Sequence, residues 1–354
     1  MFLRKYKWLI LILSGLTFIY LIFFNFTTIN DNRDFQIYME KLRVISENLV
    51  RKGWDDSTVA QWKISLEISK NSPKGSCNFK NIVVALHGDS LEDYLWEYVS
   101  LLVLRERWKH EHNITIGVFL SPKSKRALGK VLFRVHLDSV KTHPSDCLDF
   151  KHAEILGNQD TPKFAKDPSR PQLFLLEPGA KRYPELVHTD LIWLKGGLIL
   201  RKSLLSEAKN RMRRLKESFK RENDTNNIYL VALHLGINRI PLKVPLTFYK
   251  TAINTVLKWH EEAGFVIFCP KSKMSFCKDT FDEEESHLKI VQTKDEADDL
   301  AALTLFDGNI IRSDLGFLAA LLNDGETLLF QTHSTDNDPA AFVARYQPKW
   351  LLIN

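Results

Sequence analysis

The chain has 354 residues, of which 44% are apolar and 26% are charged, as in a folded globular protein of about two domains. This composition excludes a disordered, collagenous or multi-span membrane chain, and four cysteines are too few for a small protein built on disulfides. The net charge is +6, with 49 basic and 43 acidic residues, but Arg4, Lys5 and Lys7 precede the first apolar run. Removing these three leaves 46 basic against 43 acidic residues, too even a balance for a nucleic-acid-binding protein.

The segment from Trp8 to Phe24 carries no charge and is long enough, at the short end of the range, to span a membrane as a helix. No small-residue cleavage site follows it, so we predict a signal anchor and not a cleaved signal peptide. The basic residues before it, with none after it until Arg33, place the N-terminus in the cytosol and the rest of the chain in the lumen. The sequence therefore predicts a single-pass type II protein of the endoplasmic reticulum or Golgi membrane, with a cytosolic tail over 1–7 and an anchor over 8–24.

Residues 25–78 are predicted to form a stem between this anchor and the folded part. Tyr38, Leu42, Ile45 and Leu49 mark one apolar stripe of a helix within it. The stripe covers fewer heptads than a coiled coil needs, so we expect the helix to pack on the folded part. A homodimer through the stem is the alternative.

Three acceptor triplets for N-glycosylation begin at Asn25, Asn113 and Asn223, and the predicted lumenal placement exposes them to modification. Asn25 is too close to the bilayer to be modified, so we predict glycosylation at Asn113 and Asn223.

Four cysteines in an oxidising lumen allow three pairings: they are Cys77, Cys147, Cys269 and Cys277. Pairing Cys269 with Cys277 closes the shortest loop and is the disulfide that we expect. Four buried free thiols are the alternative.

From residue 79 onwards, apolar runs alternate with helix-period patterns, which is typical of parallel sheets built from strand–helix–strand units. The first part is predicted to have strands over 81–87, 114–120, 131–137 and 172–176, a helix over 91–102 and a basic helix over 202–221. The last third is predicted to have strands over 228–233, 265–269, 288–292, 309–311 and 327–330, separated by helices over 247–262, 272–281, 295–305 and 315–322. We interpret the basic helix as a solvated face, with an anion-facing patch as the alternative. The predicted fold class is α/β, with two Rossmann-like doubly wound domains over 79–225 and 226–354.

In such a fold a ligand is expected where the strand ends open onto loops. His234 ends one buried strand, and Asn238 and Arg239 follow on its loop, where donors and a cation suit a diphosphate. Ser313 and Asp314 begin the helix over 315–322, and a helix N-terminus attracts anions. The alternatives are a structural strand-end histidine, a surface arginine and an ordinary helix cap.

No metal site is predicted. Asp336 and Asp338 are interpreted as part of a turn before Pro339. Zinc-ligand spacings, G-x-S-x-G, the Walker loop and G-x-G-x-x-G are all absent, which disfavours metallohydrolases, α/β-hydrolases, nucleotide triphosphatases and dinucleotide oxidoreductases.

Several segments of the chain resemble short sequence motifs, and they occur in the same order as those motifs. Leu91–Leu101 resembles the phrase L-G-N-Q-(M/L)-x-E-Y-A-x-L, and Val231–His234 resembles the start of V-G-V-H-V-R-R-G-D. Asp299–Thr304 resembles D-x-A-L-L-T, Gly316–Thr327 resembles G-x-W-A-A-Y-L-x-G-G-D-T, and Pro348–Trp350 matches a closing P-E-W. In this order, from about residue 80 to the end, the chain resembles the galactoside α-1,2-fucosyltransferase family.

The resemblance implies a GT-B-like fold, GDP-fucose as donor substrate with no cofactor or metal, and inverting transfer to the 2-hydroxyl of a galactose-terminated glycan. It implies a donor-nucleotide domain over 226–354 and an acceptor side over 79–225. His234 matches the histidine of the family's H-x-R-R-x-D loop, which is thought to hold the diphosphate. Gly236 and Ile237 stand where that loop has its two arginines, and Asn238 and Arg239 stand where it has Gly and Asp. Arg239 is therefore the cation expected to replace the missing arginines. The alternative is a non-catalytic lumenal protein that binds a glycan or a partner transferase.

Overall fold

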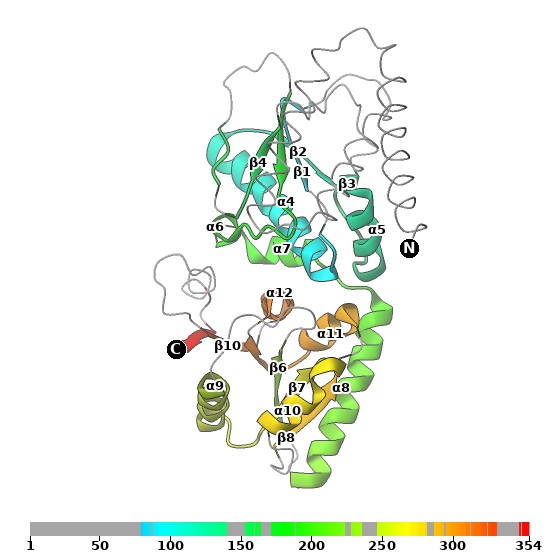
Figure 1. Cartoon of the computed structure of the whole chain (residues 1–354), viewed down its shortest axis with the longest axis vertical. Helices are drawn as coiled ribbons and strands as arrows, with labels where there is room; N and C mark the ends of the chain where they lie inside the picture. The colour runs from blue at the N-terminus through cyan, green and yellow to red at the C-terminus, as the bar shows by residue number, and fades with distance from the viewer. Residues whose placement is uncertain are drawn as a thin grey trace, which may run out of the picture. The chain divides into compact units, whose positions relative to one another are not determined.

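The computed structural model of the chain (Figure 1) describes residues 79–85, 88–139, 153–158, 160–163, 171–187, 189–223, 228–235, 246–281, 287–293, 295–311, 313–323, 325–330, 347 and 349–353. The predicted tail, anchor and stem lie outside these ranges, as do Asn25, Cys77 and Cys147. Within the ranges, no helix combines the length and the apolar character needed to cross a membrane.

Five strands form the first sheet in the order β3-β2-β1-β5-β4, and every neighbouring pair is parallel. The residues of β1 and β2 are fully buried, which explains their unbroken apolar runs, because a parallel sheet is covered on both faces. The strands are β1 (Asn81–Ala85), β2 (Ile116–Leu120), β3 (Asp138–Ser139), β4 (Glu154–Leu156) and β5 (Gln172–Leu176).

The longest helix of this part, α4 (Leu91–His112), follows β1 and packs on β2. It begins at Ser90, whose hydroxyl accepts a hydrogen bond from the Asp93 N–H at 3.1 Å in a capping box. The other helices are α5 (Pro122–Val131), α6 (Tyr183–Val187) and α7 (Leu191–Gly197).

The strand predicted over 131–137 is wrong. Ser121 caps α5 and Pro122 takes its first turn, so the chain enters a helix that buries Leu128 and Val131 on one face and ends at Val131. Leu132 makes only an isolated antiparallel bridge to Leu200.

The second sheet has the order β11-β10-β9-β6-β7-β8 and is also parallel throughout. Counted from β6, this is the strand order 3-2-1-4-5-6 of a Rossmann fold. The strands are β6 (Tyr229–His234), β7 (Ala263–Cys269), β8 (Leu288–Gln292), β9 (Gly308–Ile311), β10 (Glu326–Phe330) and β11 (Trp350–Ile353). The α/β class and the parallel sheets predicted from the sequence are therefore confirmed, and β11 is an additional edge strand.

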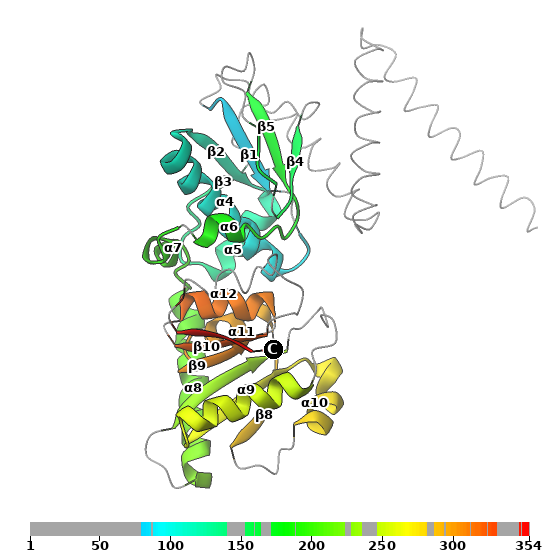
Figure 2. The same ribbon diagram turned by 90° about the vertical axis from the view of Figure 1, so that its left-hand side faces the viewer.

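Helices cover both faces of this sheet (Figures 1 and 2). One face packs on α9, and the other packs on α8, α11 and α12. The helices are α8 (Lys202–Asn223), α9 (Leu246–Trp259), α10 (Met274–Thr280), α11 (Glu296–Leu303) and α12 (Asp314–Leu322), with a single 3₁₀ turn over Lys271–Lys273 before α10.

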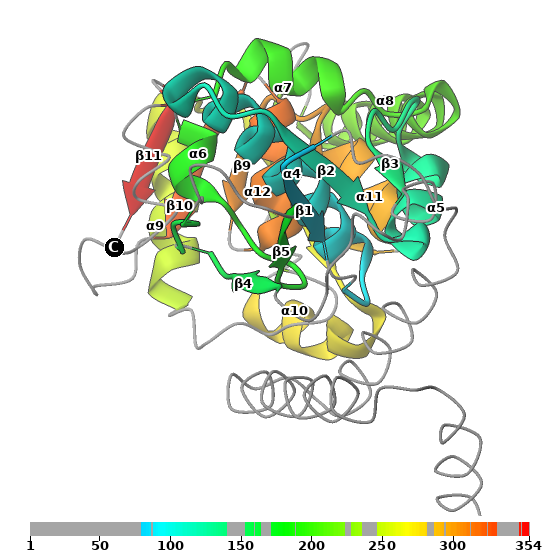
Figure 3. The same ribbon diagram turned by 90° about the horizontal axis from the view of Figure 1, so that it is seen from above.

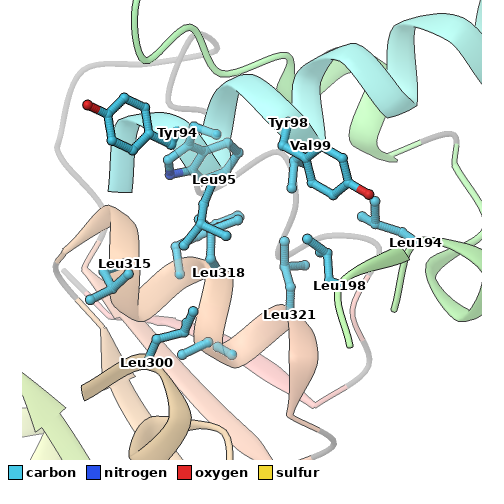
Figure 4. Close-up of a cluster of buried hydrophobic side chains, with 14 of the residues drawn as sticks. Tyr94, Leu95, Tyr98, Val99, Leu194, Leu198, Leu300, Leu315, Leu318 and Leu321 are labelled. Carbon is cyan, nitrogen blue, oxygen red and sulfur yellow. The ribbon is translucent and has the colours of Figure 1, made fainter. Parts of the chain in front are cut away.

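The two sheets share one continuous apolar core, in which α4 and α7 lie over α12 and α11 (Figures 3 and 4). In the close-up, Leu95 of α4 points towards Leu318 of α12, and the ring of Tyr98 points towards Leu194 of α7 (Figure 4). The ring of Phe317 lies between those of Trp96 and Trp350, with centroids 5.6 and 5.2 Å away. Because α12 is apolar around nearly its whole circumference, it is stable only when buried on all sides, and α4 provides that cover.

Candidate functional site

The carboxyl ends of β6 and β9 meet where the strand order of the second sheet reverses. In open parallel sheets this switch point is where ligands bind, because the loops from the two strands leave in opposite directions. β6 ends at His234, and β9 leads to Ser313, the residue that caps α12. The structure therefore brings together two of the residues predicted from sequence, although 79 positions separate them.

His234 is buried, with 2% of its surface exposed, and its Nδ1 lies 2.5 Å from the hydroxyl oxygen of Ser313. Burial lowers the pKa of His234 to about 4, so the imidazole is neutral near pH 7. Its second nitrogen, Nε2, has no hydrogen-bond partner among the described residues. A buried, unpartnered ring nitrogen at the switch point is a group that a ligand could satisfy.

Gly316 lets the first turn of α12 approach these groups closely. Its N–H donates to the hydroxyl oxygen of Ser313 at 3.0 Å. A Cβ at this position would lie 2.9 Å from that oxygen and 3.0 Å from the side chain of Ile311. The glycine is therefore required by the contact between helix and strand, and not by the backbone angle.

The N-terminus of α12 is occupied by acidic side chains from within the protein. The N–H of Leu315 donates to the Glu92 carboxylate of α4 at 3.2 Å, and Asp314 forms an ion pair with Lys181. The arrangement is reciprocal, because Glu296 at the start of α11 accepts hydrogen bonds from the N–H groups of Leu91 and Glu92 at 2.7 and 3.3 Å. Each part of the chain thus supplies a carboxylate to a helix N-terminus of the other, where negative charge is favourable.

Glu92 and Asp314 are close enough to repel each other. The pKa of Glu92 is raised to about 8, mainly by burial and also by the charge of Asp314, while Lys181 acts in the opposite direction. Glu92 is therefore largely protonated near neutral pH, which allows the carboxyl pair to persist beside one lysine. We call Glu92, Lys181 and Asp314 the carboxyl–lysine cluster.

A second buried carboxyl group joins the strand ends of the first sheet. Glu97 of α4 is fully buried and accepts hydrogen bonds from the N–H of Gly88, after β1, at 2.5 Å and from the hydroxyl of Ser124, after β2, at 2.7 Å. Burial raises the pKa of Glu97 to about 8, while these hydrogen bonds lower it. Glu97 has its partners within the protein, so we assign it a role in holding these loops and not in contacting a ligand.

Arg211 of the basic helix α8 reaches the second sheet. Its guanidinium lies 5.0 Å from the Phe268 ring centre and 3.5 Å from the buried Asp299 carboxylate. Burial raises the pKa of Asp299 to about 7, and Arg211 lowers it. Arg213 and Arg214 of this helix are exposed, in agreement with a mainly solvated face.

The remaining predicted residues are distributed as follows. Asn238 and Arg239 lie outside the described residues, and so do Asp336 and Asp338. Asn113 is exposed and ends α4 with a φ of 50°, and Asn223 is the last residue of α8. Within the described ranges, no three His, Cys, Asp or Glu side chains form a group that could hold a metal ion.

Cys269 and Cys277 form a disulfide with Cα atoms 6.5 Å apart. Both are buried, and Cys269 ends β7 beside the switch point. The bond therefore fixes the turn from β7 into α10 at the same edge of the sheet as His234.

Sequence reasoning missed Glu92 and Lys181. Glu92 lies inside the segment that resembles the first family phrase, at the position where the family has Gly, and this difference is the one signal that could have singled it out. Lys181 follows β5 in an irregular segment and has no motif around it.

Comparison with known proteins gives only distant similarities. No protein-family profile matches the chain, and no curated protein matches it either. Among solved structures, a glycosyl transferase family 9 protein from Veillonella parvula is 11% identical and covers 79% of this chain and 88% of its own, with a TM-score of 0.42. A mutant of Arabidopsis thaliana FUT1 in complex with GDP is 9% identical, covering 85% and 80%, with a TM-score of 0.44. The ADP-heptose lipopolysaccharide heptosyltransferase II of E. coli is 12% identical, covering 77% and 90%, with a TM-score of 0.38. Similarity at this level defines neither a family nor an activity for this chain.

Proposed function

We propose that the chain is a GT-B-like glycosyltransferase that transfers L-fucose from GDP-fucose to the 2-hydroxyl of a galactoside, with inversion and without a metal ion. The single observation that carries the proposal is the pair His234 and Ser313 at the switch point of a 3-2-1-4-5-6 sheet, with Nε2 of the histidine unpartnered. The order of motifs that resembles α-1,2-fucosyltransferases supplies the donor and the acceptor. With the predicted anchor, this makes it a type II protein of the Golgi membrane.

The proposed transfer reaction explains why hydrogen-bond donors and cations are needed at the switch point. Departure of GDP builds negative charge on the leaving diphosphate while the fucose ring gains oxocarbenium character. Without a metal ion, that charge must be met by fixed hydrogen-bond donors and cations. We assign this role to Nε2 of His234 and to Arg239. Loss of one such donor typically costs about 3–4 kcal/mol of transition-state stabilisation.

A non-catalytic lumenal protein is the second candidate, and one observation favours it. Glu92 already accepts a hydrogen bond from the Leu315 N–H, and Asp314 adds a second carboxyl at the same helix end. The Leu315 N–H is therefore already used within the protein, and the Asp314 carboxylate opposes the approach of a second anion to that helix end, because like charges repel.

GDP binding by the purified full chain, followed by GDP release from GDP-fucose with galactosides present, tests the proposal. Asn at position 234 replaces Nδ1 but not Nε2, whereas Gln replaces Nε2 but not Nδ1, so His234→Asn should lose GDP affinity and His234→Gln should retain part of it. Arg213→Ala, on the exposed face of α8, is the control and should bind like the wild type. No affinity for GDP would refute the transferase, GDP binding without turnover would favour the second candidate, and turnover that requires manganese would contradict the metal-independent mechanism.

A further inference from the structure

A groove runs along the outer edge of β2, away from the switch point. It has a volume of about 430 Å³, and its lining includes the consecutive residues from Thr115 to Phe119. β3 pairs only with Phe119 and Leu120, so among the described residues no strand covers the edge of β2 before Phe119. The backbone groups of this edge therefore lie beside the groove without a strand partner among the described residues, although the β2 residues themselves are buried.

Besides apolar side chains such as Phe79 and Leu137, the lining has polar and aromatic side chains that carry both signs of charge: Arg105, Glu106, Lys109, His136, Asp138 and Trp193. Within the part of the chain that the structure describes, Arg105, Lys109 and Trp193 have no side-chain hydrogen-bond partner. Trp193 is 36% exposed, on α7. Two cations and two carboxylates thus face the groove, and the carboxylates of Glu106 and Asp138 also contact His110 and Lys125 outside it.

This wall matches a neutral ligand that carries many hydroxyl groups. An exposed indole offers a flat apolar face with a polar edge, and the C–H face of a sugar ring can pack against it. Charged side chains of both signs can donate to and accept from hydroxyls, whereas an ionic or a purely aliphatic ligand would leave half of them unsatisfied.

A source of such a ligand lies at the rim of the groove. Asn113 begins an acceptor triplet for N-glycosylation, it is exposed at the end of α4, and Thr115 of the same triplet lines the groove. Two residues span at most about 7 Å, so the first sugar on Asn113 starts beside the groove.

The position of the groove separates it from the transfer chemistry. Thr115 and Ile116 stand at the amino end of β2, whereas the strand-end loops of the candidate site leave from the carboxyl ends of the sheets. A sugar bound at the amino end is therefore not placed for the proposed reaction, which favours a structural occupant over the acceptor substrate.

We propose that an N-linked glycan on Asn113 packs into the groove along the β2 edge, with a sugar ring against Trp193. The proposal rests on the lumenal placement that is part of the proposed function, but it does not depend on transferase activity. The bound glycan covers the open strand edge and joins α4, β2 and α7.

The test uses the full chain expressed in a secretory host, with glycan occupancy at Asn113 and Asn223 measured by mass spectrometry. The rate at which an endoglycosidase releases the Asn113 glycan from the native protein should rise several-fold in Trp193→Ala. Ile192→Ala is the matched control, because Ile192 lies on the same helix, is 82% exposed and does not line the groove. Asn113→Gln should lower Tm by about 2–4 °C in the wild type and should leave Tm unchanged in Trp193→Ala.

Each other outcome overturns the proposal in a recognisable way. A chain modified at Asn223 but not at Asn113 reaches the lumen and has no glycan for the groove, whereas modification at neither site also contradicts the proposed topology. Equal release rates in the two α7 variants would show that Trp193 does not hold the glycan. Trp193-dependent binding of free oligosaccharides, or of a peptide, by Asn113→Gln would assign the groove to that ligand.

Discussion

Replacing Glu92 by Gln tests the carboxyl–lysine cluster directly. The substitution keeps the shape of the side chain and an oxygen that can accept from the Leu315 N–H, but it removes the ionisable group. The pKa of Glu92 is about 8 in the folded chain because of burial and the neighbouring Asp314, against 4.5 without them. Between these two values the unfolded chain has released a proton that the folded chain still holds.

The sign of the pH dependence follows from this difference. A carboxyl group whose pKa is raised on folding contributes its full stability below about pH 4.5, and that contribution is lost as the pH rises to about 8. The slope is about 1.4 kcal/mol per pH unit, so the whole interval corresponds to about 4–5 kcal/mol. The Gln side chain of Glu92→Gln does not ionise, so the variant lacks this pH-dependent contribution to stability. The variant should therefore match the wild type near pH 5 and be the more stable of the two at pH 8.5.

Urea unfolding followed by tryptophan fluorescence, repeated from pH 5 to pH 8.5, measures the effect. Glu217→Gln, on the exposed side of α8, is the control and should follow the wild type at every pH. The difference in free energy of unfolding between wild type and Glu92→Gln should change steadily over this range. A difference that stays constant with pH would show that Glu92 ionises normally in the folded chain and that the cluster is not buried as described.

Three further predictions concern the core, the disulfide and the switch point. Phe317→Ala should lower the free energy of unfolding by about 3–5 kcal/mol, because it removes the ring between Trp96 and Trp350; a loss below 1 kcal/mol in urea would contradict a core shared by both sheets. Replacing Cys269 and Cys277 together by Ala should cost about 2.5 kcal/mol through the short loop that the disulfide closes, as measured by urea unfolding of both chains without reductant; an unchanged free energy of unfolding would contradict this contribution. His234 has its pKa lowered to about 4 by burial, so the free energy of unfolding of the wild type should fall by about 3 kcal/mol relative to that of His234→Asn as the pH drops from 6.5 to 4, measured in acid titrations of both chains followed by circular dichroism.

Much of the local structure follows from neighbouring residues. The apolar run before His234 predicts a buried strand that ends in a polar side chain, and Ser313 before Asp314 predicts a helix cap; both are observed. The error over 131–137 is also local in origin: apolar residues after a helix look like a strand, but α5 extends to Val131 and the chain then makes a single bridge to Leu200.

Contacts between distant segments could not be predicted in the same way. Glu92 meets Leu315 across 223 positions, and Glu296 meets Leu91 across 205, because α4 packs on α12 and α11 through apolar side chains that many arrangements would bury equally well. The sequence by itself determined the long apolar strands, the caps and the placement of His234 and Ser313 at strand ends, since these depend on hydrogen bonding and burial within a few residues. Only the tertiary structure decided that acidic side chains occupy the α12 N-terminus, because the pKa of Glu92 and its nearness to Asp314 and Lys181 exist only once the two sheets have packed together.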